Sequence, residues 1–264
     1  FLGNIFVVIF AKNTNNNFII PVLIASIIPI INFLLVFFYL PETKPNSDSN
    51  KSKPIIKNPL KNLFTVFKEE KIKKLSLAFF IYFIAFTGLT NILIFFLQES
   101  LNWTTKASSG TLVVVGIIAI IVQGGLIGPL VKQFGEMRLT LIGSGFILVA
   151  CALLITAPKE NATINIYSAV SFLAVGAGLI TPTLRALISK KLDIDKQGSI
   201  LSNLQGLQSL GGVLGIAMAG RVYDSFGPKS PFIAGSVILL FMIYLIAEGK
   251  SNNSFNNQKS KVLK

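Results

Sequence analysis

Seven long apolar stretches, each almost free of charged residues, divide this chain of 264 residues. They cover approximately residues 18–40, 75–98, 110–131, 139–157, 164–188, 200–222 and 231–247. As a helix, each is long enough to cross a hydrocarbon core, which requires roughly 20 residues. A backbone inside lipid must satisfy its own hydrogen bonds, and continuous apolar runs do not fit the alternating pattern of membrane β-barrel strands. The sequence therefore predicts an all-α integral membrane protein.

Composition supports the same fold class. Hydrophobic residues make up 52% of the chain and charged residues 13%, against about 25% charged residues in an ordinary soluble domain. The net charge of +13 raises the question of a nucleic-acid partner, which depends on where the charge lies.

The basic residues follow the alternation of a multi-pass chain. If segment 41–74 lies in the cytoplasm and every apolar stretch crosses the membrane, the cytoplasmic segments carry most of the Lys and Arg residues. The external segments then carry only Lys12, Lys106, Lys159, Arg221 and Lys229. This asymmetry is the one that the positive-inside rule describes. We therefore expect a multi-pass protein of the cell inner (plasma) membrane with a cytoplasmic C-terminus, and a lipid bilayer, not nucleic acid, as the partner of the charge.

Polar segments divide the chain into four parts. Residues 1–40 contain a short apolar segment, interpreted as the end of a further helix, and the first full stretch, so we expect the end of an N-terminal transmembrane bundle whose earlier part is missing. Residues 41–74, rich in Lys, Asn, Ser and Pro, predict a flexible basic cytoplasmic linker. Residues 75–249 predict a six-helix transmembrane bundle, and residues 250–264 a disordered cytoplasmic tail.

The second part of the linker has an amphipathic pattern. Leu60, Leu63, Phe64 and Phe67 recur at helical spacing between lysines. This pattern favours a short helix on the anionic inner leaflet over a calmodulin-like partner site.

Groups for catalysis or metal binding are scarce. The chain has no histidine and one cysteine, Cys151, which we expect to be a small packing residue. A disulfide framework and a Cys/His metal site are therefore excluded, and no cofactor is expected. The sequence also lacks a mid-membrane carboxylate pair, a nucleophile with a candidate base and a phosphate-binding loop, so an enzyme is not expected.

The order of one helix, a long basic loop and six helices resembles the second half of a major facilitator superfamily transporter. The segment GGLIGPLVKQFGEMRL, residues 124–139, is similar to the cytoplasmic loop signature of that superfamily. Gly128, Leu130, Gly135 and Arg138 match the signature, whereas Lys132 stands where the first-half copy of the family prefers Asp. The resemblance implies a conformational role for Gly128, Gly135 and Arg138, and a tight loop with an ordinary positive-inside arginine stays an equal alternative.

Two later segments are similar to the tenth and eleventh helices of bacterial drug:proton antiporters in that superfamily. They contain Pro182, which we interpret as a helix hinge, the pair Gln197-Gly198, and a glycine-rich run that ends near Tyr223. Gly211, Gly215 and Ala219 lie four residues apart on one helix face, as do Gly124 and Gly128 on another. Such faces permit close helix crossing, and they suit both static packing and the rocking of one bundle against another.

Polar and aromatic side chains inside apolar helices mark the expected substrate path, because each polar one costs free energy unless it faces partners or water. We predict that the path is lined by Tyr82, Phe86, Asn91, Gln123, Asn203 and Gln208, with Phe83 and Phe95 available for an apolar solute. The alternative for each amide is a hydrogen bond to a neighbouring helix. A lining of amides and aromatic rings favours a neutral, cationic or amphiphilic solute over a strongly anionic one.

Ionisable groups are absent from the centres of the stretches, and Arg185 is interpreted as snorkelling to the inner interface. Proton coupling, which requires an ionisable group in the pathway, would then depend on the missing N-terminal half. The function expected from the resemblance is secondary active efflux of drugs or amphiphilic small molecules by alternating access. A nutrient or sugar importer on the same fold and a truncated, non-transporting membrane protein stay as alternatives.

Overall fold

The structure is a computed structural model that describes the chain outside residues 1–18, 40–62, 159–161 and 263–264. The chain divides into two compact units, Phe1–Asn58 and Pro59–Lys264, and each is described by itself. The apolar segment 1–11 and most of the predicted linker lie outside the described residues.

The first unit contains helix α2, Ile19–Tyr39, where the sequence predicts the first full stretch. Pro29 lies inside this helix. Its described side chains are exposed within the unit, and Phe33 stacks on Phe37 with ring centroids 6.1 Å apart. An isolated helix with an apolar surface all round is typical of a membrane span.

The second unit is an assembly of long helices, which confirms the predicted all-α fold class. Its elements are the 3₁₀ helix η1 (Phe64–Lys68), α4 (Lys73–Phe95), the π-helical turn η2 (Phe96–Ser100), α5 (Thr105–Ile121), the π-helical turn η3 (Val122–Leu126), α6 (Ile127–Phe134), α7 (Glu136–Thr156), α8 (Thr163–Ser189), α9 (Ile194–Phe226) and α10 (Ser230–Val262).

Five helical segments among the described residues are long and apolar enough to cross a membrane. They are Lys73–Ser100, Thr105–Phe134, Glu136–Thr156, Thr163–Ser189 and Ser230–Glu248. Helix α9 matches the fifth of the six stretches predicted for this bundle, but its Gly, Ser, Gln and Asn residues make it less apolar than the other five.

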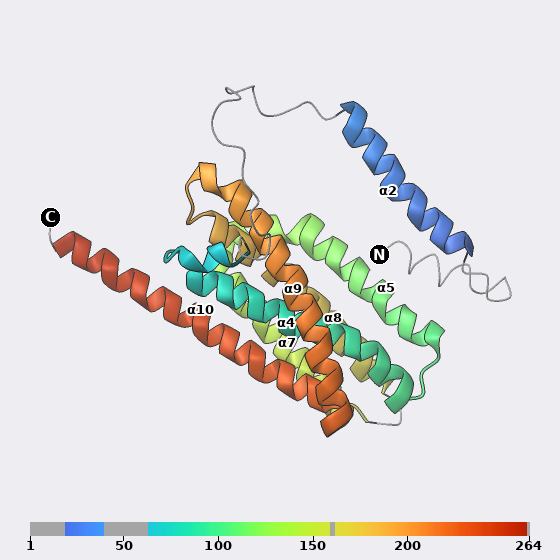
Figure 1. The fold of residues 1–264 in the computed structure, drawn as a ribbon. Helices are drawn as coiled ribbons and strands as arrows, with labels where there is room; N and C mark the ends of the chain where they lie inside the picture. The colour runs from blue at the N-terminus through green and yellow to red at the C-terminus, as the bar shows by residue number, and fades with distance from the viewer. Residues whose placement is uncertain (1–18, 40–62, 159–161, 263–264) are drawn as a thin grey trace. The chain divides into compact units, whose positions relative to one another are not determined.

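The helices of the second unit run alternately up and down. Along its axis α4 packs against α9 and α10, while α7 packs against α8, and α8 also contacts α5 (Figure 1). Three ion pairs join elements at one end of the bundle: Lys74 with Glu248 at 2.6 Å, Lys196 with Glu69 at 3.7 Å, and Lys190 with Glu136. We call this the lysine-rich end, and it is the end that the sequence predicts to face the cytoplasm.

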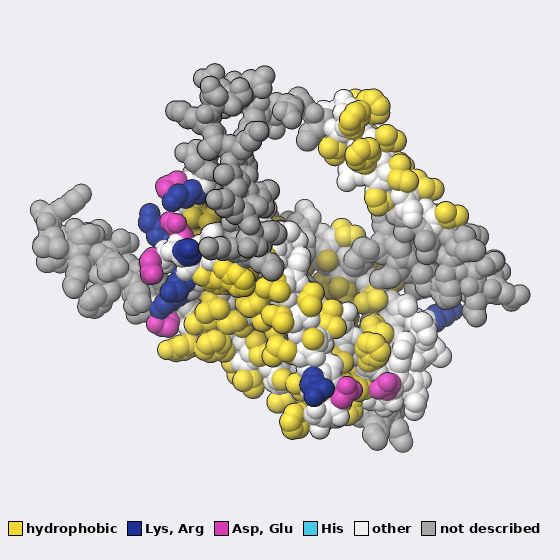
Figure 2. Space-filling model, in the orientation of Figure 1, with side chains coloured by type: hydrophobic (Ala, Val, Ile, Leu, Met, Phe, Trp, Pro, Cys, Tyr) yellow, Lys and Arg dark blue, Asp and Glu magenta, His cyan; other side chains and the backbone are white. Residues whose placement is uncertain are grey.

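Charged side chains gather toward the ends of the bundle, and a broad apolar surface lies between them (Figure 2). Large hydrophobic residues on that surface include Ile120, Val213 and Val237, each more than half exposed. In water such a surface would drive aggregation, whereas in lipid it is the expected outer face of a span.

Close helix contacts in the bundle depend on glycines. A Cβ added to Gly215 of α9 would lie 2.3 Å from the carbonyl oxygen of Ile84 on α4, and one added to Gly88 would lie 2.8 Å from the Gly215 oxygen. The backbones can approach this closely only without side chains. The predicted close-packing face of Gly211, Gly215 and Ala219 therefore meets α4, whereas Gly124 and Gly128 have open space around them.

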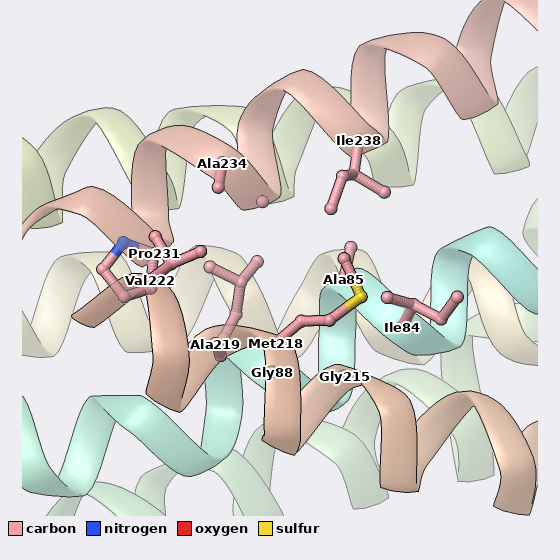
Figure 3. Close-up of a pocket in the computed structure, with 12 residues that line it drawn as sticks. Ile84, Ala85, Gly88, Gly215, Met218, Ala219, Val222, Pro231, Ala234 and Ile238 are labelled. Atoms are coloured by element: carbon pink, nitrogen blue, oxygen red, sulfur yellow. The ribbon is translucent and has the colours of Figure 1, made fainter. Parts of the chain in front are cut away.

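A small apolar cavity of about 40 Å³ remains beside this crossing, between α4, α9 and α10. Gly88, Gly215 and Ala219 lie at its base and Ala234 and Ile238 of α10 face them (Figure 3). Its lining is apolar, and a space of this size is a packing gap between small residues instead of a site for a drug-sized ligand.

The segment before α4 differs from its sequence prediction. Instead of lying as an amphipathic helix on the leaflet, it forms the short η1 helix, and Val66 is fully buried in the core of the bundle. A Cβ added to Gly206 of α9 would lie 2.1 Å from a methyl group of Leu63, so Leu63 fills the space above that glycine. The folded unit consequently begins before the predicted boundary at residue 75.

The C-terminal helix is longer than expected. Helix α10 continues to Val262, through most of the segment 250–264 predicted as a disordered tail. No proline or glycine interrupts residues 250–262, so the backbone can propagate the helix.

Candidate functional site

A polar cluster forms where α4, α8 and α9 meet, toward the lysine-rich end of the bundle. Its centre is Arg185, in the penultimate turn of α8. The Nη2 atom of Arg185 donates to the amide oxygens of Gln205 and Gln208 on α9, at 2.7 and 2.5 Å. The two glutamines lie three residues apart and so share one face of their helix.

Aromatic side chains of α4 form the other side of this cluster. The guanidinium carbon of Arg185 lies 5.9 Å from the centre of the Phe79 ring, within the range of a cation–π contact. Phe79 is fully buried and packs on Phe83, with ring centroids 4.8 Å apart. Arg185 was expected from the sequence to snorkel to the inner interface, whereas these contacts hold it against the helices.

The next layer contains two of the predicted path residues. The hydroxyl of Tyr82 lies 3.3 Å from that of Thr181, which is one turn before Arg185 on α8. Tyr82 is fully buried, and its ring stacks on that of Phe86, with centroids 5.5 Å apart and an interplanar angle of 13°. The structure therefore places Tyr82, Phe86 and Gln208 around one cluster.

The other predicted path residues lie elsewhere. Asn91 is exposed, and its side-chain amide donates to the Thr87 carbonyl oxygen of its own helix at 2.9 Å. Gln123 is exposed in the η3 turn. Asn203 donates to the Thr65 hydroxyl at 3.2 Å, so it holds the segment before α4. Asn203 thus follows the alternative considered for it, a hydrogen bond to a neighbouring helix, whereas Asn91 and Gln123 do not, and their place in the substrate path stays a prediction.

Arg185 and Thr181 were not selected as site residues from the sequence, and Gln205 was a candidate only through its position on the same helix as Asn203 and Gln208. A signal was present in the spacing, because Thr181 and Arg185 are four residues apart and Gln205 and Gln208 three apart. Which helices face each other, however, is not readable from spacing, so the two pairs could not be joined.

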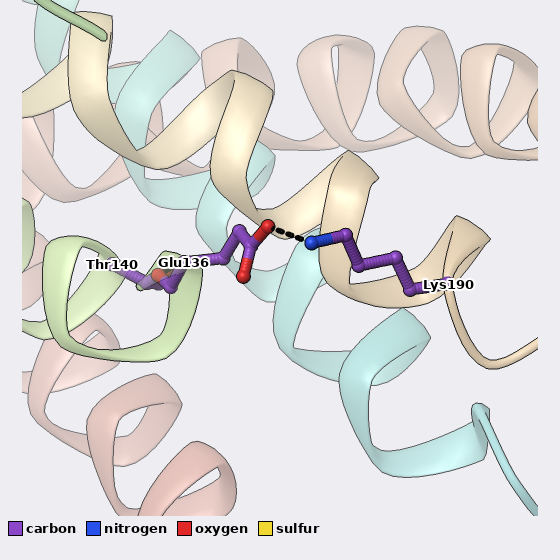
Figure 4. Close-up of polar contacts among 3 residues, drawn as sticks. All are labelled: Glu136, Thr140 and Lys190. Carbon is purple, nitrogen blue, oxygen red and sulfur yellow. Dashed lines mark hydrogen bonds and ion pairs between the residues drawn. The ribbon is translucent and has the colours of Figure 1, made fainter. Parts of the chain in front are cut away.

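The loop between α6 and α7 turns at Gly135, whose φ of 76° and ψ of 158° lie in a region accessible essentially to glycine alone. Gly128 is helical and has no atom within 4 Å of an added Cβ, so it makes no close helix contact among the described residues. Arg138 is exposed. The carboxylate of Glu136 accepts a hydrogen bond from Lys190, just past the end of α8 (Figure 4).

Three further features lie near the ends of α8 and α9. Helix α8 continues through Pro182, so the hinge interpretation of this residue stays a prediction. Partial burial lowers the pKa of Lys191, just beyond α8, because it disfavours the charged amine. At the opposite end of the bundle, the Tyr223 hydroxyl donates to the carboxylate of Glu99 at 2.9 Å and joins α9 to the η2 turn that follows α4.

Metal binding has no support in the described part of the chain, where no group of three or more His, Cys, Asp or Glu side chains is close enough to hold an ion. The chemistry that the polar cluster offers is hydrogen bonding and charge.

Comparison with known proteins gives a consistent pattern. Residues 1–216 match the sequence profile described as Major Facilitator Superfamily. The tetracycline resistance protein, class H, of Pasteurella multocida is 24% identical over 204 residues, which is 77% of this chain and 50% of that protein. Its class C counterpart in Escherichia coli is 26% identical over 130 residues, 49% of this chain and 32% of that protein.

A human protein and a solved structure extend the comparison. The Hippocampus abundant transcript-like protein 1 of Homo sapiens is 21% identical over 257 residues, 86% of this chain and 49% of that protein. The crystal structure of the human organic anion transporter MFSD10 (TETRAN) superimposes with a TM-score of 0.69 at 19% identity, covering 82% of this chain and 54% of that one. At this identity the likeness shows a shared fold. The chain spans about half the length, or less, of these relatives.

Proposed function

The chain belongs to the Major Facilitator Superfamily, and from that membership we propose that it acts in the export of amphiphilic small molecules, including drugs, across the membrane in which it lies. The superfamily consists of multi-pass membrane transporters and not of enzymes. The chain contributes one six-helix bundle, predicted as residues 75–249 and extended by the η1 segment before α4, together with the end of a second bundle, and the preceding part of residues 41–74 links them.

The observation that carries this proposal is the polar cluster of Arg185, Gln205 and Gln208 beside the aromatic residues of α4. Polar groups inside a membrane bundle are costly and characteristically line a substrate or ion path. Transporters of this architecture bind their substrates between two bundles, at sites made by helices of both. Helices α4, α8 and α9 would supply the wall on this side, with Tyr82, Phe86 and Gln208 in or directly behind it.

Alternating access needs a bundle that moves as a body. The close crossings of α4 with α9 at Gly88 and Gly215 support this, because backbone-to-backbone packing leaves little freedom within the bundle. The mechanism would be a rocking of the two bundles that exposes the site to each side of the membrane in turn. The loop residues Gly128, Gly135 and Arg138 and the proline at 182 are proposed to take part in that motion.

Export is proposed over import because two of the relatives are named for tetracycline resistance. The lysine-rich end is proposed to face the cytoplasm, which follows the positive-inside rule and places the C-terminus inside. Protons would be coupled through a carboxylate in the other bundle, since the acidic side chains described in residues 63–248 lie near the ends of the candidate membrane spans or outside them.

The test is an accumulation assay in cells that lack their own major efflux pumps and express the protein as its gene encodes it. We expect these cells to retain less tetracycline, followed by its fluorescence, than cells with an empty vector. A protonophore is expected to abolish the difference. Higher retention would identify an importer, and equal retention at verified membrane expression would indicate a protein that does not export this substrate; either result contradicts the proposal.

A further inference from the structure

We propose that Arg185, Gln205 and Gln208 bind an anionic group, a carboxylate, of the transported solute. This inference rests on the proposed transport function and narrows its substrate class. It also reverses the expectation from sequence that the path disfavours a strongly anionic solute, because that expectation rested on a lining of amides and aromatic rings without Arg185.

The first argument is the missing counter-ion. The ion pairs among the described residues belong to Lys74, Lys190 and Lys196, and none includes Arg185. The partners of its guanidinium are two neutral amide oxygens and the face of the Phe79 ring. Arg185 is partly buried, and a charge that has lost part of its water with only neutral partners is not fully compensated, so an arriving anion is stabilised there.

The second argument is an unused donor. The Nε atom of Arg185 is buried and has no hydrogen-bond partner among the described residues. A buried donor without a partner is rare in native structures and requires an explanation. Both Nη2 hydrogens donate to the glutamines, so a carboxylate that takes the place of one glutamine oxygen can accept from Nη2 and Nε together, the two parallel hydrogen bonds that arginine favours.

The third argument is that the polar groups of the cluster left free for a ligand are hydrogen-bond donors. A guanidinium only donates, so each glutamine has to turn its oxygen toward Arg185, and each amide NH₂ group is left to face another ligand. The cluster therefore offers N–H donors from three side chains. Gln205 is exposed and Gln208 half-buried, so these donors are accessible from the side of α9.

Buried aromatic residues position this group. Phe79 lies beneath the guanidinium and is itself fixed by Phe83, and Tyr82 is held by Thr181 on the turn before Arg185. A preorganised donor group loses little entropy when it binds its ligand. A lipid phosphate offers the same acceptor chemistry as a solute carboxylate, and the experiment has to distinguish the two.

The test uses the full protein in lipid vesicles and a pair of fluorescent probes, 1-pyrenebutyrate and its methyl ester, which differ in one negative charge. We expect the wild-type protein to transport the carboxylate and Arg185→Gln to lower that rate about tenfold, the usual scale for losing a charge-assisted hydrogen bond. The methyl ester is expected to be transported at the same rate by both proteins. Arg185→Lys retains the positive charge but not the two parallel N–H donors of the guanidinium, so an intermediate transport rate of the carboxylate is expected. Arg221→Gln, which removes an exposed arginine near the opposite end of α9, serves as the matched control and should change neither rate.

The outcomes separate the anion site from the proposed function. If the wild-type protein transports neither probe and exports no tetracycline, the proposed function itself fails. If the transport rates of both probes fall equally in Arg185→Gln while the vesicles contain the variant at the wild-type level, Arg185 only connects α8 to α9 and the anion site is refuted. If the carboxylate rate is unchanged by the substitution but the dependence of transport on anionic lipid content is lost, the ligand is a lipid headgroup, which also overturns the inference.

Discussion

Glu136, the first residue of α7, accepts a hydrogen bond from the amine of Lys190, one residue past the end of α8. The pair joins two helices that also pack along their length, and it lies at the lysine-rich end of the bundle. Lys190 is 67% exposed and Glu136 15% exposed, so water and salt screen the attraction between them.

We predict a small coupling energy for this pair. Exposed ion pairs contribute about 0.2–1 kcal/mol in double-mutant cycles. Thermal unfolding of Glu136→Gln, Lys190→Gln and the double variant in detergent should give a coupling in that range, which falls as salt is raised. A coupling that is larger and insensitive to salt would show that the pair is more strongly shielded from water than the structure indicates.

Gly215→Ala should destabilise the bundle by about 1–3 kcal/mol, the usual cost of overpacking. The reason is that the new Cβ would lie 2.3 Å from the backbone oxygen of Ile84, which cannot move aside as a side chain can. Gly220→Ala on the same helix is the matched control, because an added Cβ there has no atom within 4 Å. Thermal unfolding should separate the two variants, and equal stabilities would contradict the close crossing.

Gly135→Ala should cost about 1–3 kcal/mol, because a side chain is strained at φ 76° and ψ 158°. Gly128→Ala, the other glycine of the loop signature, lies in a helix with open space around it and should be neutral or stabilising by up to about 1 kcal/mol. The measurement is the unfolding temperature of each variant. A loss of stability at residue 128 equal to that at residue 135 would refute this distinction.

Val66→Asp should release the η1 segment from the bundle. Full burial of a valine side chain stabilises by about 1.5–3 kcal/mol, so trypsin cleavage after the exposed residues Lys68 and Lys71 should accelerate roughly tenfold or more. Phe64→Asp is the control, since Phe64 is 46% exposed and should matter little. Mass spectrometry of the first fragments distinguishes these cuts, and resistance of Val66→Asp would show that the segment does not depend on this contact.

Two amides with the same sequence prediction should behave differently in transport. Gln208→Ala removes a hydrogen bond to a charged group and should slow transport of 1-pyrenebutyrate about tenfold. Asn91→Ala removes a bond to the backbone of its own helix and should leave the rate within about twofold, since a helix retains its backbone ladder without it. If Asn91→Ala slows transport more than Gln208→Ala does, the substrate path lies along the exposed face of α4 and this prediction is wrong.

The spans were predictable because lipid imposes one rule on the sequence. A helix that crosses the membrane has to be long, apolar and nearly free of charge, and the positions of α4, α7 and α8 follow the stretches closely. Helix α9 was identified in the same way, although its glycines and amides make it the least apolar of the six.

Part of the candidate site was predictable and part was not. Tyr82, Phe86 and Gln208 were selected because polar and aromatic residues stand out in an apolar helix. Arg185 was assigned to the headgroups because it is near the end of a span, and the distance from a helix end does not reveal which neighbours lie beside it.

The sequence by itself determined that this chain is a helical membrane protein and where its long apolar helices lie along the chain, because hydropathy acts along each helix separately. The tertiary structure decided which faces meet. Only the packing of α4, α8 and α9 shows that Arg185 binds two glutamines and lies over Phe79, that Gly215 is in contact with a backbone while Gly128 is not, and that Val66 is in the core. Those contacts depend on how each helix is rotated about its axis and shifted along it relative to its neighbours. The residues next to one another along the chain do not indicate either quantity.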